Sequence, residues 1–213
     1  METTDADRYR VLRVDDDAVV LVDLSPADDP VDAYEPVRVA AGDADDELEP
    51  GNVVEAALDW SGDDPRFASL NVVRRSRYWF ADGVENMFEA ATDAWSDARA
   101  AGDAMTSRVT HNTDGEPNGA LYVFADPGGE PESPVRRAAG PSGGGRDLYT
   151  EFRDGTTPID PLVERVNDAD ESASESPPRD VFVLRPASGP FVVVYVAFEQ
   201  DGLLSRTVRD TYF

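Results

Sequence analysis

Eight consecutive apolar residues at positions 191–198, FVVVYVAF, constrain the fold of this chain more than any other feature. A half-buried strand alternates apolar and polar residues, whereas this run is apolar at every position. It therefore predicts a strand that is buried on both faces in the interior of a sheet. The run is far too short to cross a bilayer as a helix. Asp201-Gly202 follows it and is typical of a hairpin turn, so we expect residues 203–208 to return as an antiparallel strand.

The first 80 residues predict a small closed barrel. Short apolar-alternating segments are separated by turn residues every 8–12 positions, the pattern of a five-stranded barrel. An OB-like barrel is the first interpretation and an SH3-like barrel the second, with the domain expected at 8–80. The five strands are expected at 9–14, 18–24, 36–41, 52–60 and 66–80, the last one bent near Arg74.

The pattern changes after residue 81, where an α+β domain is expected at 81–213. Apolar residues at helical spacing predict a helix from the N-cap Asp82 to Gly102. Shorter helices are expected at 147–152 and 158–166. Strands are expected at 106–111, 120–125 and 181–184, and the sheet is predicted to be mainly antiparallel with helices on one face. Two low-complexity loops are expected at about 126–146 and 167–180.

The charge indicates a folded protein suited to concentrated salt. The formal net charge is −25, all 19 basic residues are arginine, and aromatic and β-branched residues are too frequent for a disordered acidic chain. Acidic surfaces repel in dilute buffer, but at 1 M salt the Debye length is only about 3 Å. We therefore expect a halophilic source with a salt-filled cytoplasm.

The sequence contains none of the common catalytic or targeting signals. It has no cysteine, which excludes disulfides and thiolate chemistry, and its first residues lack the apolar core of a signal peptide. No phosphate-binding loop, nucleophile elbow or zinc-protease motif is present. We therefore expect a cytoplasmic protein without a cofactor or resident metal, and no membrane association. A catalytic activity is not favoured.

Several segments together resemble an uncharacterised protein family of halophilic archaea. The segments are LDWSGDDPRFASLNVVRRSRYWF, NTDGEPNGALYVFAD, VFVLRPA and the terminal VRDTYF. The resemblance covers nearly the whole chain. It implies a halophilic source and the pairing of a barrel with an α+β half. It implies no activity and no site residues.

A polar cluster at 110–118 is the first candidate site. It holds the only histidine, His111, close to Asp114, and such a pair is the usual minimum for acid–base work or metal binding. With Arg209, these residues are the catalytic candidates of a small metal-assisted hydrolase. The candidate ligand-binding residues around them are Thr110, Asn112, Thr113 and Asn118. Turn chemistry alone explains every residue type in the cluster except the histidine.

A basic and aromatic cluster at 74–79 is the second candidate site. Arginine beside aromatic residues on a small barrel is how single strands of RNA or DNA are bound, by phosphate contact and base stacking. The candidates are Arg74, Arg75, Arg77, Tyr78 and Trp79. Phosphate contacts weaken steeply with salt, so stacking would have to supply most of the affinity.

The sequence thus favours a non-catalytic binding or regulatory module. Single-stranded nucleic acid is one candidate ligand, and a protein partner is another.

Overall fold

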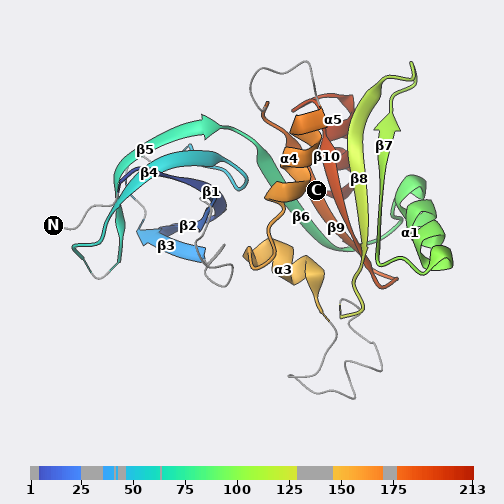
Figure 1. Ribbon diagram of the computed structural model, residues 1–213, viewed down its shortest axis with the longest axis horizontal. Helices are drawn as coiled ribbons and strands as arrows, with labels where there is room; N and C mark the ends of the chain where they lie inside the picture. Colours follow the sequence, from blue (N-terminus) through green and yellow to red (C-terminus); the bar gives the residue numbers. More distant parts are fainter. Residues whose placement is uncertain are drawn as a thin grey trace.

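In the part of the chain that the structure describes, a closed β-barrel is followed by a second, five-stranded sheet with four helices, an α+β fold (Figure 1). The description rests on a computed structural model. It covers residues 5–24, 36–40, 42, 47–62, 64–128, 146–169 and 177–213. Most of the two loops predicted at about 126–146 and 167–180 lies outside these residues.

The barrel has the strand order β1-β2-β3-β5-β4, closed by pairing of β1 with β4. All pairs are antiparallel except β3 with β5, which is parallel. Inward-facing side chains such as Val11, Leu21 and Leu58 form its core. The predicted five-stranded barrel is thereby confirmed. The strands are β1 (Asp7–Val14), β2 (Ala18–Asp23), β3 (Pro36–Ala40), β4 (Val53–Asp59) and β5 (Arg66–Arg74).

The fifth predicted strand, 66–80, is in fact two strands in two different sheets. β5 ends at Arg74, and β6 (Arg77–Val84) leaves the barrel and joins the second sheet. Ser76 lies buried at the switch, where its carbonyl accepts a hydrogen bond from the Asn52 side chain at 3.0 Å. The apolar face switches at Arg74 because the chain changes sheets there, and not because one strand bends.

The second sheet has the order β6-β9-β10-β8-β7. β6 runs parallel to β9, and the other pairs are antiparallel. β10 lies in the middle and is buried at every position, as its apolar run predicts. The other strands are β7 (Met105–His111), β8 (Pro117–Ala125), β9 (Asp180–Pro186) and β10 (Phe191–Ala197).

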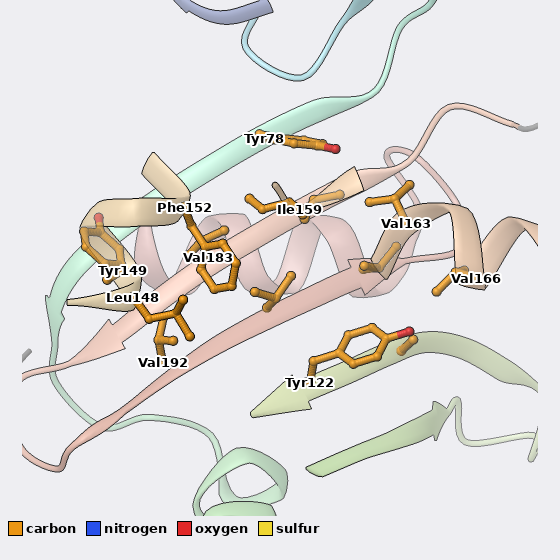
Figure 2. Close-up of a cluster of buried hydrophobic side chains, with 14 residues drawn as sticks. Tyr78, Tyr122, Leu148, Tyr149, Phe152, Ile159, Val163, Val166, Val183 and Val192 are labelled. Carbon is orange, nitrogen blue, oxygen red and sulfur yellow. The ribbon is translucent and has the colours of Figure 1, made fainter. Parts of the chain in front are cut away.

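Helices cover both faces of this sheet, not one face as predicted. The first face carries α3 (Leu148–Asp154) and α4 (Asp160–Ala169), whose apolar side chains pack on the sheet as Figure 2 shows. The second face carries α1 (Glu89–Ala101) and α5 (Leu203–Tyr212). The four helices divide evenly because β9 and β10 are apolar on both sides and need two covering layers. None of the described helices is long and apolar enough to cross a membrane.

Two predicted elements differ from the structure. The helix predicted from Asp82 begins only at Glu89, because Asp82 is still in β6 and pairs with Arg185. Its predicted end is confirmed, since Gly102 takes a left-handed conformation with φ of 79°. The strand predicted at 203–208 is the helix α5. Both neighbours of β10 are already supplied by β8 and β9, so no edge remains for it.

Polar and close contacts join the barrel to the second half. Arg10 on β1 is buried, lies over the Tyr78 ring at 5.3 Å and forms an ion pair with Asp160 of α4. Arg74 pairs with Glu164 of the same helix at 2.7 Å. The barrel and the sheet are therefore linked through α4.

Candidate ligand-binding site

The β7–β8 hairpin is organised by Asn112. Its Oδ1 accepts hydrogen bonds from the backbone N–H groups of Asp114 at 3.0 Å and Glu116 at 2.9 Å. Gly115 has a positive φ of 82°, which confirms the turn predicted at Asp114-Gly115. The second predicted turn, Asn118-Gly119, is instead part of β8, beside a shift in strand register.

A hydrogen-bond chain lies behind the hairpin. The Tyr195 hydroxyl donates to Thr110 Oγ1 at 2.8 Å, and Thr110 Oγ1 donates to Asn118 Oδ1 at 2.8 Å. Burial raises the pKa of Tyr195, so its hydroxyl keeps its proton and remains a donor. Gly119 allows this packing, because a Cβ there would meet side-chain atoms of Leu204 and Tyr195 at 2.7 and 2.9 Å. These two hydrogen bonds hold the Asn118 side chain in place.

A cavity of about 620 Å³ lies between this hairpin and the start of α5. Ligand sites in proteins usually enclose about 300–1,000 Å³, so the volume suits a small molecule. Two of its apolar side chains are freely accessible, since Val109 is 52% and Leu203 72% exposed. The apolar lining consists of Val109, Pro117, Val166, Phe198, Leu203 and Leu204. We call this cavity the hairpin pocket.

Polar side chains also line the hairpin pocket. Arg179 is 2% exposed, and its guanidinium donates to Asn167 Oδ1 at 3.0 Å and to the carbonyl of Phe198. The same guanidinium lies over the Phe198 ring at 5.5 Å. The polar lining consists of Asn112, Glu116, Asn118, Arg179 and Glu199. Apolar walls with a few fixed polar groups are the usual composition of a ligand site.

Sequence reasoning missed Arg179, Phe198 and Glu199. They stand at the two ends of apolar strands, just before β9 and just after β10. The antiparallel pairing of these strands brings Asp180 opposite Ala197, so both ends meet at one edge of the sheet. The signal in the sequence is a charged residue close to each of two apolar runs: Arg179 is two residues before Val181, and Glu199 directly follows Phe198.

The structure divides the predicted ligand-binding residues. Asn112 and Asn118 line the hairpin pocket. Thr110 is not part of the lining, but its hydroxyl donates a hydrogen bond to Asn118. Thr113 is exposed in the turn.

The predicted catalytic residues are not brought together in the pocket. His111 and Asp114 are exposed on the hairpin, and neither belongs to the pocket lining. Arg209 is on α5, where it pairs with Asp201 at 2.9 Å and lies over the Trp79 ring at 5.8 Å. Within the described part of the chain, no three histidine or acidic side chains come close enough to hold a metal ion.

The residues predicted to bind nucleic acid form ion pairs or pack against other parts of the same chain. Arg74 pairs with Glu164, Arg75 with Glu47 at 3.3 Å, and Arg77 with Asp180 at 2.8 Å. Tyr78 is buried on one face of the second sheet, and Trp79 packs on the other face. In this arrangement none of the five presents a free charge or an open ring face in a common groove.

Comparison with known proteins gives one match. No curated protein and no solved structure shows significant similarity to the chain. The profile of one protein family, however, matches residues 1–213. The chain belongs to the Family of unknown function (DUF6663).

Proposed function

We propose that the protein is a non-catalytic binding module whose ligand site is the hairpin pocket. The observation that carries the proposal is the combination, in one cavity of about 620 Å³, of an apolar wall with polar side chains held by hydrogen bonds. Such a cavity binds the apolar part of a molecule and orients its polar end. Two of the residues that the sequence predicts for ligand binding, Asn112 and Asn118, belong to its lining.

The charges of the pocket favour a neutral or cationic amphipathic molecule. Glu116 and Glu199 line the pocket, and the chain as a whole is strongly acidic. The cation of Arg179 is already engaged by the Phe198 carbonyl and the Asn167 side chain. An anionic ligand would therefore meet net repulsion, whereas an amine or amide group could donate to the carboxylates.

Binding of two dyes tests the proposal. Neutral Nile red should bind wild type saturably in concentrated KCl, and more strongly than an anionic naphthalene sulfonate dye. Leu203→Glu places a charge in the apolar wall at an exposed helix start, so it should reduce Nile red affinity at least tenfold without unfolding the protein. Val73→Glu is the matched control, because Val73 is exposed on the barrel. Equal loss in both variants, or none in either, would contradict the proposal.

The alternative of a metal-assisted hydrolase at His111 and Asp114 has less support, because both side chains are exposed outside the pocket. His111→Ala and Asp114→Ala should leave dye binding unchanged. Their cost in stability should stay within ~0.5 kcal/mol, as for surface changes. Native mass spectrometry of wild type and both variants tests the hydrolase alternative, because it detects a bound metal ion or small molecule. A bound species that disappears from both variants would favour the hydrolase.

The alternative of single-stranded nucleic-acid binding is favoured by the barrel's topology alone. The support for an OB-like rather than an SH3-like barrel is the strand order, with β3 parallel to β5. OB-folds bind oligonucleotides beside the loop after the first strand and the loop between the fourth and fifth. The first of these loops carries Asp15, Asp16 and Asp17, and the second carries Asp64 and follows Asp59 at the end of β4. Because these carboxylates would repel phosphate, the hairpin pocket is the better-supported site.

The setting we propose for this function is concentrated salt, in an acidic cytoplasmic proteome of a halophile. The support is the composition: 44 acidic residues stand against 19 arginines and no lysine.

A further inference from the structure

One edge of the second sheet is formed by β7, which among the described residues pairs only with β8. The backbone N–H of Ala125 donates to the carbonyl of Ala104 at 2.8 Å, next to the pair Met105 and Phe124. In antiparallel strands, hydrogen-bonded pairs alternate with non-bonded ones. The N–H and C=O groups of Met105, Ser107 and Val109 therefore point away from β8. Unpaired edge groups of this kind are a template for another strand.

Every second side chain of β7 lies on the same face of the sheet. Met105, Ser107 and Val109 stand opposite Phe124, Tyr122 and Ala120, so they lie on the face that α3 and α4 cover elsewhere. They are nevertheless accessible, with Met105 42% and Val109 52% exposed.

The opposite face of β7 differs, because Arg108 there pairs with Asp97 of α1 at 3.3 Å. The edge thus combines exposed apolar side chains on one face with a charge that is already paired on the other.

We propose that two copies of the chain associate through their β7 edges, antiparallel and with a two-fold axis at Ser107. In this register, Met105 stands opposite Val109 of the second copy, and the two Ser107 residues face each other. All three pairs use the outward-pointing backbone groups, so the two sheets become one continuous sheet of ten strands.

At both ends of the paired strands, this register brings a hydrogen-bond donor and an acceptor together. Asp103, two residues before Met105, comes opposite His111 of the second copy. Both side chains are exposed, and neither has a hydrogen bond or ion pair with another described residue. An imidazole N–H can donate to a carboxylate whether the ring is neutral or charged. The proposed contact thereby uses the only histidine, which turn chemistry leaves unexplained.

The competing register, with the axis at Arg108, is disfavoured. It would place two arginines directly opposite each other in a non-hydrogen-bonded pair, where Cα atoms are only about 4.5 Å apart. Like charges at such positions are destabilising.

The association should be weak and dependent on salt. A single strand edge is small beside the ~1,600 Å² of a standard interface, so we expect dissociation constants in the micromolar range or above. Each copy carries a formal charge of −25, and repulsion between copies is screened only at high ionic strength. The dimer fraction should therefore rise as KCl is raised.

Sedimentation velocity of the full chain in molar KCl, over a range of protein concentrations, tests the proposal. Wild type should show a reversible monomer–dimer equilibrium. Ser107→Pro removes an outward N–H but no bond to β8, so it should fold and weaken dimerisation at least tenfold. Ser107→Ala keeps the N–H and should dimerise like wild type. Wild type that remains monomeric at every concentration, or a Ser107→Pro variant that dimerises equally, would overturn the proposal.

Charge variants test the register independently of proline. Asp103→Lys should weaken the dimer by several fold, and Asp103→Lys combined with His111→Glu should restore it. Met105→Lys, at an exposed position, should also weaken it and serves where Ser107→Pro fails to fold. A double variant that is no better than Asp103→Lys alone would refute the proposed register.

Discussion

Arg77 and Asp180 form a two-point ion pair between the parallel strands β6 and β9. Nε and Nη2 of Arg77 donate to the two carboxylate oxygens at 2.8 and 3.0 Å. Asp180 is completely buried, and it also accepts hydrogen bonds from the Ser205 hydroxyl and the Asp201 N–H. An arginine that the sequence assigns to nucleic-acid binding thus joins two strands and the start of α5.

Asp180→Asn should cost about 3–5 kcal/mol, because it removes the buried counter-charge of Arg77 and leaves only the exposed carboxylate of Asp201, at 2.8 Å. Urea unfolding at neutral pH measures this cost. Replacing both partners, by Arg77→Met and Asp180→Leu, should cost less than the sum of the two single changes. Additive costs would show that the two residues do not act as a pair.

The same pair predicts a loss of stability in acid. Burial acts to raise the pKa of Asp180, but hydrogen bonds from Arg77 and Ser205 outweigh it and lower the pKa below its ordinary value. The contribution is therefore present above the unfolded-state pKa of about 3.9 and is lost as the pH falls through the lower folded-state value. Urea midpoints of wild type and Asp180→Asn should converge below that pH, and a constant difference would contradict the assignment.

Asp126 should show the opposite pH dependence. It is buried at the end of β8, where its Oδ1 accepts the Leu148 N–H at 2.8 Å, and burial raises its pKa. Because the folded state then binds the proton more tightly than the unfolded state, the contribution of Asp126 to stability is lost as the pH rises above about 4 and through the higher folded-state pKa. Asp126→Asn keeps the acceptor oxygen without the charge. It should equal wild type in acid and match or exceed it in thermal melts at pH 7, whereas a less stable variant at pH 7 would contradict this. The exposed Asp93→Asn is the control.

The barrel and the second half should unfold together. Asp160→Ala removes the partner of the buried Arg10, so it should cost about 3–5 kcal/mol and lower the stability of both halves. Glu55→Ala removes only an exposed pair with Arg8 and should cost within ~1 kcal/mol. Calorimetry of wild type should show one transition. Two separate transitions in wild type would show that the ion pair does not couple the halves.

Salt should stabilise the fold. The excess of carboxylates repels itself in dilute buffer, and this repulsion is screened as the ionic strength rises. Thermal midpoints should therefore increase from dilute to molar KCl. Equal midpoints across the series would show that the acidic surface does not limit stability.

Local sequence signals predicted the elements that depend on local chemistry. Gly102 and the turn at Asp114-Gly115 were found because a left-handed conformation favours glycine. The apolar run at 191–198 correctly predicted a strand buried on both faces, although helices were expected on only one of them. The same run supplies the reason for the second layer, since two apolar faces require two covers.

Elements that depend on pairing partners were not predictable in this way. Residues 203–208 follow a hairpin signal, yet they form a helix because β8 and β9 already occupy both sides of β10. The ion pair of Arg77 joins residues 103 positions apart, and nothing near either residue indicates the other. The hairpin pocket was found only in part for the same reason. Asn112 and Asn118 lie in the polar cluster, whereas Arg179 reaches the pocket through the pairing of distant strands.

The parallel pairing of β6 with β9 also determines the order in which the protein can form during synthesis. All five barrel strands have left the ribosome once residue 74 has emerged, so the barrel can close early. β6 follows directly, but the one described strand that pairs with it begins at Asp180, near the far end of the chain. Non-local pairings of this kind form slowly. A nascent chain that is stalled before Asp180 would therefore carry a closed barrel and an unpaired β6. This unpaired strand would be the segment most prone to pair incorrectly with another chain.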